Sequence, residues 1–114
     1  NKLIHKPYIS FLKNNDNFSI YETPKYSINN NWLNILKIKN SKKNDKKKLI
    51  SKFIKNKIFV RPVWKLNHLQ KQYTNCQRYK INNANLIFAN SVCLPSSYHL
   101  SHDDIKRIIG VINE

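Results

Sequence analysis

The sequence has a single glycine, Gly110, and no methionine among its 114 residues. Phosphate-cradling loops, dinucleotide-binding turns and the strained turn around a nucleophilic serine each need several closely spaced glycines. One glycine therefore excludes all three kinds of site. Because no methionine is present to begin the chain, we expect it to be part of a longer protein.

Acidic residues are also scarce: six stand against 21 lysines and arginines, which gives a formal net charge of +15. So few carboxylates leave little for a catalytic carboxylate pair. Such a charge is typical of nucleic-acid-binding proteins. However, lysine far outnumbers arginine, asparagine is as frequent as lysine, and isoleucine is nearly so, which indicates a compositional bias. The densest basic run, residues 42–48, is interpreted as a solvated loop leading into a helix, with a phosphate-backbone contact as the alternative.

Cys76 and Cys93 are too far apart for a Cys-x-x-Cys motif, and no histidine pair near them has metal-ligand spacing. We therefore expect neither a disulfide framework nor a metal site. Cys76 with His68 could form a nucleophilic pair, but no third group is apparent to orient it. No apolar run approaches the roughly 20 residues of a membrane span, and no signal peptide opens the chain. The sequence predicts a cytoplasmic protein with reduced thiols and no membrane partner.

The hydrophobic pattern predicts one domain, residues 1–114, in which strands and helices alternate. Strands are predicted at 18–22, 32–38, 58–63 and 91–95, and helices near the N-terminus, at 46–56, at 83–91 and after Ser101, with one or two helical turns at 67–76. Pro7 either initiates or interrupts the first helix. The run 32–38 is apolar enough to be a central strand covered on both faces. It is followed by a helix and the strand 58–63, which allows a parallel βαβ crossover or a sheet with another strand in between.

Local signals also place helix starts and buried faces. Asp45 is predicted as the N-cap of the helix 46–56. Ser101 with Asp104 forms a variant of the capping box, which predicts the start of the last helix. Leu66, Leu69 and Tyr73 are expected to point inward, and the helix 83–91 is expected to be buried.

The side chains best suited to bind a ligand follow the strand 58–63, which Pro62 should end at a sheet edge. They are Arg61, Trp64, Lys65, His68 and Tyr73. Arginine and lysine bind anions, tryptophan provides a stacking face, and histidine and tyrosine make directional hydrogen bonds. The alternative is that the two aromatic side chains are core residues and the others are merely solvated. Clustering at the end of a strand favours a binding surface. These residues do not form a complete catalytic site.

Several ordered motifs, covering roughly residues 20–114, resemble the C-terminal part of the DegT/DnrJ/EryC1/StrS family. They are Asn31-Trp32-Leu33-Asn34, Arg61-Pro62-Val63-Trp64-Lys65-Leu66-Asn67-His68, Tyr73, Leu94-Pro95-Ser96-Ser97 and Leu100-Ser101-x-Asp103-Asp104-Ile105. The family comprises pyridoxal-phosphate-dependent aminotransferases that act on nucleotide-linked keto-sugars. The resemblance is strongest to members that make amino sugars for surface polysaccharides in the perosamine, bacillosamine and legionaminic-acid pathways.

The resemblance implies an α+β fold, the small C-terminal domain of a fold-type-I aminotransferase, with a few-stranded, mostly antiparallel sheet and helices packed on one side. Residues 1–17 would be the remnant of an interdomain helix. It implies that pyridoxal 5'-phosphate and its lysine belong to a large domain elsewhere, so this chain should have no catalytic residue, bind no cofactor and be inactive alone. It also implies a nucleotide-sugar partner for Arg61, Trp64, Lys65, His68 and Tyr73, and a homodimeric enzyme.

Two other functions remain open from the sequence. The charge of +15, with interleaved aromatic residues, motivates a stand-alone basic nucleic-acid-binding module, which would lose affinity steeply as salt rises. A remnant with only a structural role is the third hypothesis. We expect nucleic acid not to be the partner.

Overall fold

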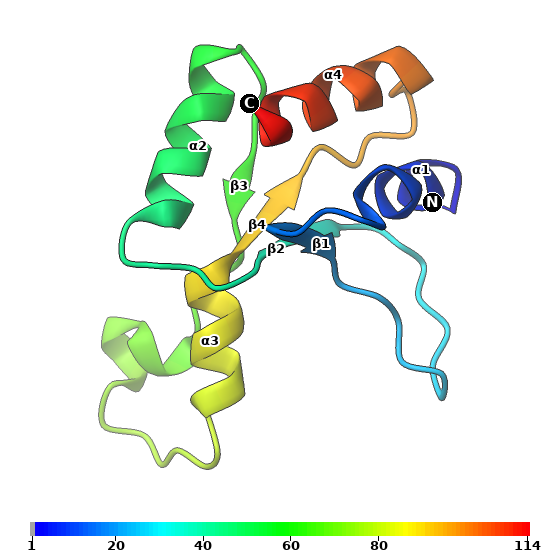
Figure 1. The fold of residues 1–114 in the computed structure, drawn as a ribbon. Helices are drawn as coiled ribbons and strands as arrows, with labels where there is room; N and C mark the ends of the chain where they lie inside the picture. Colours follow the sequence, from blue (N-terminus) through cyan, green and yellow to red (C-terminus); the bar gives the residue numbers. More distant parts are fainter. Residues whose placement is uncertain (1) are drawn as a thin grey trace.

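The computed structural model describes residues 2–114, which fold into helices around one antiparallel sheet (Figure 1). The strands are β1 (Phe18–Ile20), β2 (Asn34–Ile38), β3 (Arg61–Pro62) and β4 (Ser91–Leu94). The helices are α1 (Lys2–Leu12), α2 (Asp45–Lys55), α3 (Asn82–Asn90) and α4 (His102–Asn113), with 3-10 turns η1 (Asn67–Leu69) and η2 (Lys71–Tyr73). The predicted α+β fold class is confirmed.

The strand order is β1-β2-β4-β3, and every neighbouring pair is antiparallel. Strand β4 therefore separates β2 from β3, with Leu36 opposite Val92 on one side and Arg61 opposite Cys93 on the other. Because β2 and β3 are both antiparallel to β4, they run in the same direction without being neighbours. The alternative with an intervening strand is correct, and the direct βαβ crossover is not.

Helices α1, α2 and α4 cover one face of the sheet (Figure 1). Along β2, Leu36 and Ile38 are buried on this face, whereas Lys37 on the other face is exposed. The Lys37 ammonium nitrogen lies 5.7 Å from the centroid of the Tyr21 ring, a contact that suits a solvated face. The prediction that this strand is covered on both faces is therefore wrong for this chain. Successive side chains of β2 point to opposite faces of the sheet, and the helices cover the face that carries Leu36 and Ile38.

Helix α1 continues through Pro7, which therefore does not interrupt it. Proline removes the hydrogen bond to the carbonyl group four residues earlier, but that residue, Leu3, is 88% exposed, so water can take the place of the lost donor. The next residue, Tyr8, is fully buried, and its hydroxyl group donates to the Pro95 carbonyl oxygen at 2.9 Å. Asn1, at which the predicted segment 1–17 begins, lies outside the described residues. None of the helices between residues 2 and 114 has the length and apolar character to cross a bilayer.

Helix α2 starts differently from the prediction. The N-cap is Asn44, at φ 77°, and within the described chain its side chain makes no capping hydrogen bond. Asp45 is the first helical residue, and its carboxylate accepts the backbone N–H of Lys42 at 2.7 Å. Asp45 therefore closes the preceding turn, and its assignment as the N-cap was wrong by one position.

The last helix starts as predicted. The Ser101 hydroxyl oxygen accepts the Asp104 N–H at 3.1 Å, and the Asp104 carboxylate accepts the Ser101 N–H at 2.9 Å. This reciprocal pair is a capping box. One face of α4 is buried in the core through Ile105, Ile108 and Ile112.

The capping box predicts a pH dependence of stability. Its hydrogen bonds from the Ser101 side chain and backbone lower the pKa of Asp104 below the ordinary value of 3.8. A carboxyl group whose pKa is lowered by folding stabilises the fold above its unfolded pKa, and this contribution is lost as pH falls through the folded pKa. We expect Ser101→Ala to destabilise the chain at neutral pH and less so as pH falls below 3.8.

Urea denaturation of the 114-residue chain at a series of pH values measures this effect. The control is Ser51→Ala, an exposed serine on α2 that is outside any cap. An equal loss of stability for Ser101→Ala at acidic and neutral pH would contradict the role given to Asp104.

Candidate functional site

The predicted binding segment begins at the edge of the sheet. Within residues 2–114, strand β3 pairs only with β4. Pro62 is its last residue, as predicted, but the strand begins at Arg61 and is shorter than the predicted 58–63. The chain then passes through η1 and η2 before it reaches α3. We call residues 63–90 the lobe, because Figure 1 shows η1, η2 and α3 set apart from the other helices.

The lobe has the predicted turns but is more exposed than predicted. Leu69 and Tyr73, which were expected to point inward, are 41% and 43% exposed. In α3, which lies wholly within the described residues, no side chain is buried, and Leu86 is 60% exposed. Both burial predictions are wrong, because the apolar side chains of the lobe lie beyond the edge of the core that α1, α2 and α4 cover. Exposed apolar surface of this kind is typical of an interaction site.

The five predicted residues lie on different parts of this region. Arg61 is exposed on β3, and Lys65 is exposed in the extended segment before η1. Trp64 is 73% exposed, and its ring lies edge-on to that of Trp32 at a centroid distance of 5.8 Å. Since Tyr73 is also not buried, the alternative that Trp64 and Tyr73 are core aromatics is wrong.

The structure brings two of the five residues together. His68 and Tyr73 line a cavity of about 280 Å³, and the other described residues around it do not include Arg61, Trp64 or Lys65. Sequence reasoning missed two neighbours that line the same cavity, Arg78 and Tyr79. Their basic and aromatic character in the run Gln77-Arg78-Tyr79-Lys80 could have indicated them.

Helix α3 holds the histidine of this cavity. The Nε2 atom of His68 lies 3.0 Å from Oδ1 of Asn85, a residue of α3 that no sequence motif singles out. The helix is itself held by Lys46, whose amine donates to the Phe88 carbonyl oxygen at 2.5 Å and lies 4.3 Å from the Phe88 ring centroid. Burial lowers the pKa of Lys46. A cation near the C-terminal end of a helix also stabilises the helix dipole.

The chemistry available in the lobe is binding chemistry. Arg78 supplies a planar cation, Tyr73 and Tyr79 supply aromatic faces, and His68 supplies a hydrogen-bonding ring. Such a surface suits an anion that carries a ring. Within residues 2–114, no three histidine, cysteine, aspartate or glutamate side chains are grouped as they would be to hold a metal ion.

Comparison with known proteins decides the family. A sequence model of the DegT/DnrJ/EryC1/StrS aminotransferase family matches residues 1–113. The chain belongs to this family. The resemblance inferred from the ordered motifs is confirmed.

Solved aminotransferases share the fold. DesI, solved in the presence of its TDP-sugar product, superposes with a TM-score of 0.84 at 15% identity, covering 97% of this chain and 29% of DesI. The sugar aminotransferase CalS13 from Micromonospora echinospora gives 0.81 at 16% identity, with 97% of this chain and 28% of CalS13 covered. PseC from Helicobacter pylori, an aminotransferase of pseudaminic acid biosynthesis, gives 0.78 at 16% identity, with coverages of 98% and 30%. The chain therefore spans less than a third of each of these proteins.

The lobe does not fit the cofactor that this family implies. Pyridoxal phosphate needs a lysine for the Schiff base and a partner for its pyridine nitrogen, commonly an aspartate. Among the described residues, those that line the His68 cavity include neither a lysine nor an aspartate. The amine of Lys46 is already bound to the Phe88 carbonyl oxygen. The described residues around the cavity therefore lack the groups that hold this cofactor.

Proposed function

We propose that this chain is the small C-terminal domain of an enzyme that transfers an amino group to a nucleotide-linked keto-sugar. Membership of an aminotransferase family supports the reaction class. The structural likeness to DesI, which was solved with a TDP-sugar product, supports the class of substrate. In this proposal, residues 1–17 belong to an interdomain helix, and the isolated chain is inactive.

The substrate would lie against the lobe and the neighbouring edge of the sheet. Arg61 or Lys65 would neutralise the diphosphate group, since both are exposed cations. Trp64 and His68 would pack against the sugar and the nucleotide or hydrogen-bond to them, and Tyr73 would line the same cavity as His68. The observation that carries this placement for His68 and Tyr73 is the concave surface that they share with Arg78.

Pyridoxal phosphate, when bound, supplies the electron sink for amino transfer. We propose that its lysine belongs to a large domain of the enzyme. The role of the lobe is then to bind the substrate and to exclude water around it. The His68–Asn85 contact at 3.0 Å would keep the imidazole ring oriented for that purpose.

The exposed aromatic surface supports a further part of the proposal, a homodimeric enzyme. Trp32 and Trp64 are 62% and 73% exposed although their rings contact each other. Large aromatic side chains are enriched at the centres of protein interfaces. We propose that the Trp32–Trp64 pair lies at or near the dimer interface, beside the substrate.

The functional test is made in the intact enzyme that contains this domain. His68→Ala and Arg61→Ala should each lower kcat/KM for the nucleotide sugar by an amount equivalent to about 1–3 kcal/mol, because each removes a charged or directional hydrogen bond to the substrate. The absorbance of the bound cofactor should be unchanged. Steady-state kinetics and a cofactor absorption spectrum measure both.

His99→Ala is the matched control, since His99 is exposed on the connection before α4 and is not among the described residues that line the His68 cavity. Full activity of the His68 and Arg61 variants would overturn the placement of the substrate. A lost cofactor spectrum in either variant would contradict the assignment of these residues to substrate binding.

A further inference from the structure

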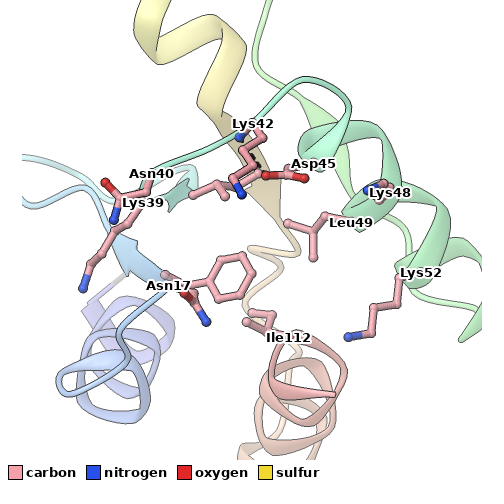
Figure 2. Close-up of a pocket in the computed structure, with 11 residues that line it drawn as sticks. Asn17, Lys39, Asn40, Lys42, Asp45, Lys48, Leu49, Lys52 and Ile112 are labelled. Carbon is pink, nitrogen blue, oxygen red and sulfur yellow. Dashed lines mark hydrogen bonds between the residues drawn. The ribbon is translucent and has the colours of Figure 1, made fainter.

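A second and larger cavity lies on the helix-covered side of the sheet. It has a volume of about 470 Å³ and is bordered by the adjoining ends of β1 and β2, by α2 and by the C-terminal end of α4. Apolar side chains form part of its wall: Phe18, Ile38, Leu49 and Ile112. Figure 2 shows Leu49 of α2 and Ile112 of α4 pointing into this space. We call this cavity the basic pocket.

The rim of the basic pocket is strongly cationic. Lys39, Lys42, Lys48 and Lys52 line it, and Asp45 is the single acidic residue among the described residues that do so. The Asp45 carboxylate accepts the Lys42 N–H at 2.7 Å, so the hydrogen bond that it makes is to the backbone.

Few of these cations are neutralised within the chain. The Lys39 amine donates to the Asn15 carbonyl oxygen at 2.6 Å. In the described part of the chain, a single lysine–carboxylate ion pair is present, between Lys106 and Asp103 of α4. Lys42, Lys48 and Lys52 therefore have no carboxylate partner among the described residues. Lys52 is half-buried and, as Figure 2 shows, its amine extends toward Ile112.

An apolar wall beside unpaired cations selects a ligand with two parts. The lysines attract a compact anion such as phosphate without requiring a fixed geometry. The wall formed by Phe18, Leu49 and Ile112 gains free energy when it buries an apolar or aromatic group. A volume of about 470 Å³ lies within the usual range of small-molecule sites.

We propose that the basic pocket binds a phosphate ester of a small apolar or aromatic group. The pocket shares no residue with the predicted substrate surface of residues 61–73 or with the His68 cavity. The proposal therefore rests on this chain alone, and it can fail or hold independently of the proposed aminotransferase function.

The test is an NMR titration of the isotope-labelled 114-residue chain with phenyl phosphate, inorganic phosphate and benzyl alcohol as separate probes. Phenyl phosphate should give saturable shifts at the amides of Phe18, Leu49 and Ile112. Its Kd should be lower than that of inorganic phosphate, and benzyl alcohol should bind more weakly still. The double variant Lys48→Ala/Lys52→Ala should weaken phenyl phosphate binding roughly tenfold, as expected for two lost charge contacts.

The matched control is Lys47→Ala/Lys55→Ala, which removes the same charge from exposed positions of α2 outside the pocket. The control variant should bind almost as tightly as the unmodified chain. Equal weakening in both double variants would show diffuse attraction to the basic surface and would overturn the proposal. Equal affinities for phenyl phosphate and inorganic phosphate, or shifts centred on the lobe, would also overturn it.

Discussion

Phe53→Ala is expected to lower the free energy of unfolding by about 3–5 kcal/mol, the usual cost of deleting a buried aromatic ring. Phe53 is fully buried on α2 and belongs to the same core cluster as Leu36 of β2 and Ile105 of α4. Removal of the ring leaves a cavity that these elements cannot close without moving. Chemical denaturation of the 114-residue chain measures the change.

Phe59→Ala is the matched control, because Phe59 is 90% exposed. Its effect on stability should stay within about 0.5 kcal/mol, as is usual for surface substitutions. Where Phe53→Ala fails to fold, Phe53→Leu keeps most of the apolar volume and should show a smaller loss. A stable Phe53→Ala chain with an unchanged denaturation midpoint would contradict the placement of α2 against the sheet.

Asn34→Ala is expected to lower the free energy of unfolding by about 1–3 kcal/mol, because it removes two hydrogen bonds of a fully buried side chain and takes away the partner of Nδ1 in the half-buried His5 ring. Asn34 is fully buried at the start of β2. Its side-chain nitrogen Nδ2 donates to the Ser96 hydroxyl oxygen at 2.9 Å, and its Oδ1 atom lies 2.7 Å from Nδ1 of His5. The same hydroxyl group accepts the Asn34 backbone N–H at 3.0 Å and donates to the Leu94 carbonyl oxygen at 3.0 Å.

A double-mutant cycle isolates this network. Ser96→Ala removes the hydroxyl group that Asn34 contacts, so the double variant should lose less stability than the sum of the two single losses, by at least about 0.5 kcal/mol. Asn83→Ala, at an exposed position of α3, is the control for an asparagine outside the network. Strict additivity between Asn34→Ala and Ser96→Ala would show that the two side chains do not act together.

This network gives a structural reason for two of the motifs that resemble the family. The motif Asn31-Trp32-Leu33-Asn34 precedes the body of β2, and the motif Leu94-Pro95-Ser96-Ser97 follows β4. Hydrogen bonds from Asn34 to Ser96 join the two motifs, and His5 ties α1 to them. These motif residues join α1 to the sheet, whereas Arg61, Trp64 and Lys65 of the motif around His68 are exposed.

The candidate site was predictable in part. The chemistry of single side chains indicated His68 and Tyr73, and the structure places both in one cavity. Arg78 lies ten residues from His68 along the chain, and Asn85 lies on another helix. The sequence therefore could not show that Arg78 and Asn85 are neighbours of His68. The assignment of Arg61, Trp64, Lys65, His68 and Tyr73 to a substrate surface stays a prediction.

The sequence alone determined the features that neighbouring residues control. The capping box of Ser101 and Asp104 sets the start of α4, and Pro62 ends the edge strand, because each depends on local backbone hydrogen bonds. Only the tertiary structure decided that β4 lies between β2 and β3, and that α3 and the Leu69 turn are left outside the core. Strand order and burial depend on which distant segments pair and pack against one another. An apolar segment has the same local pattern whether it packs against this chain or against another protein surface.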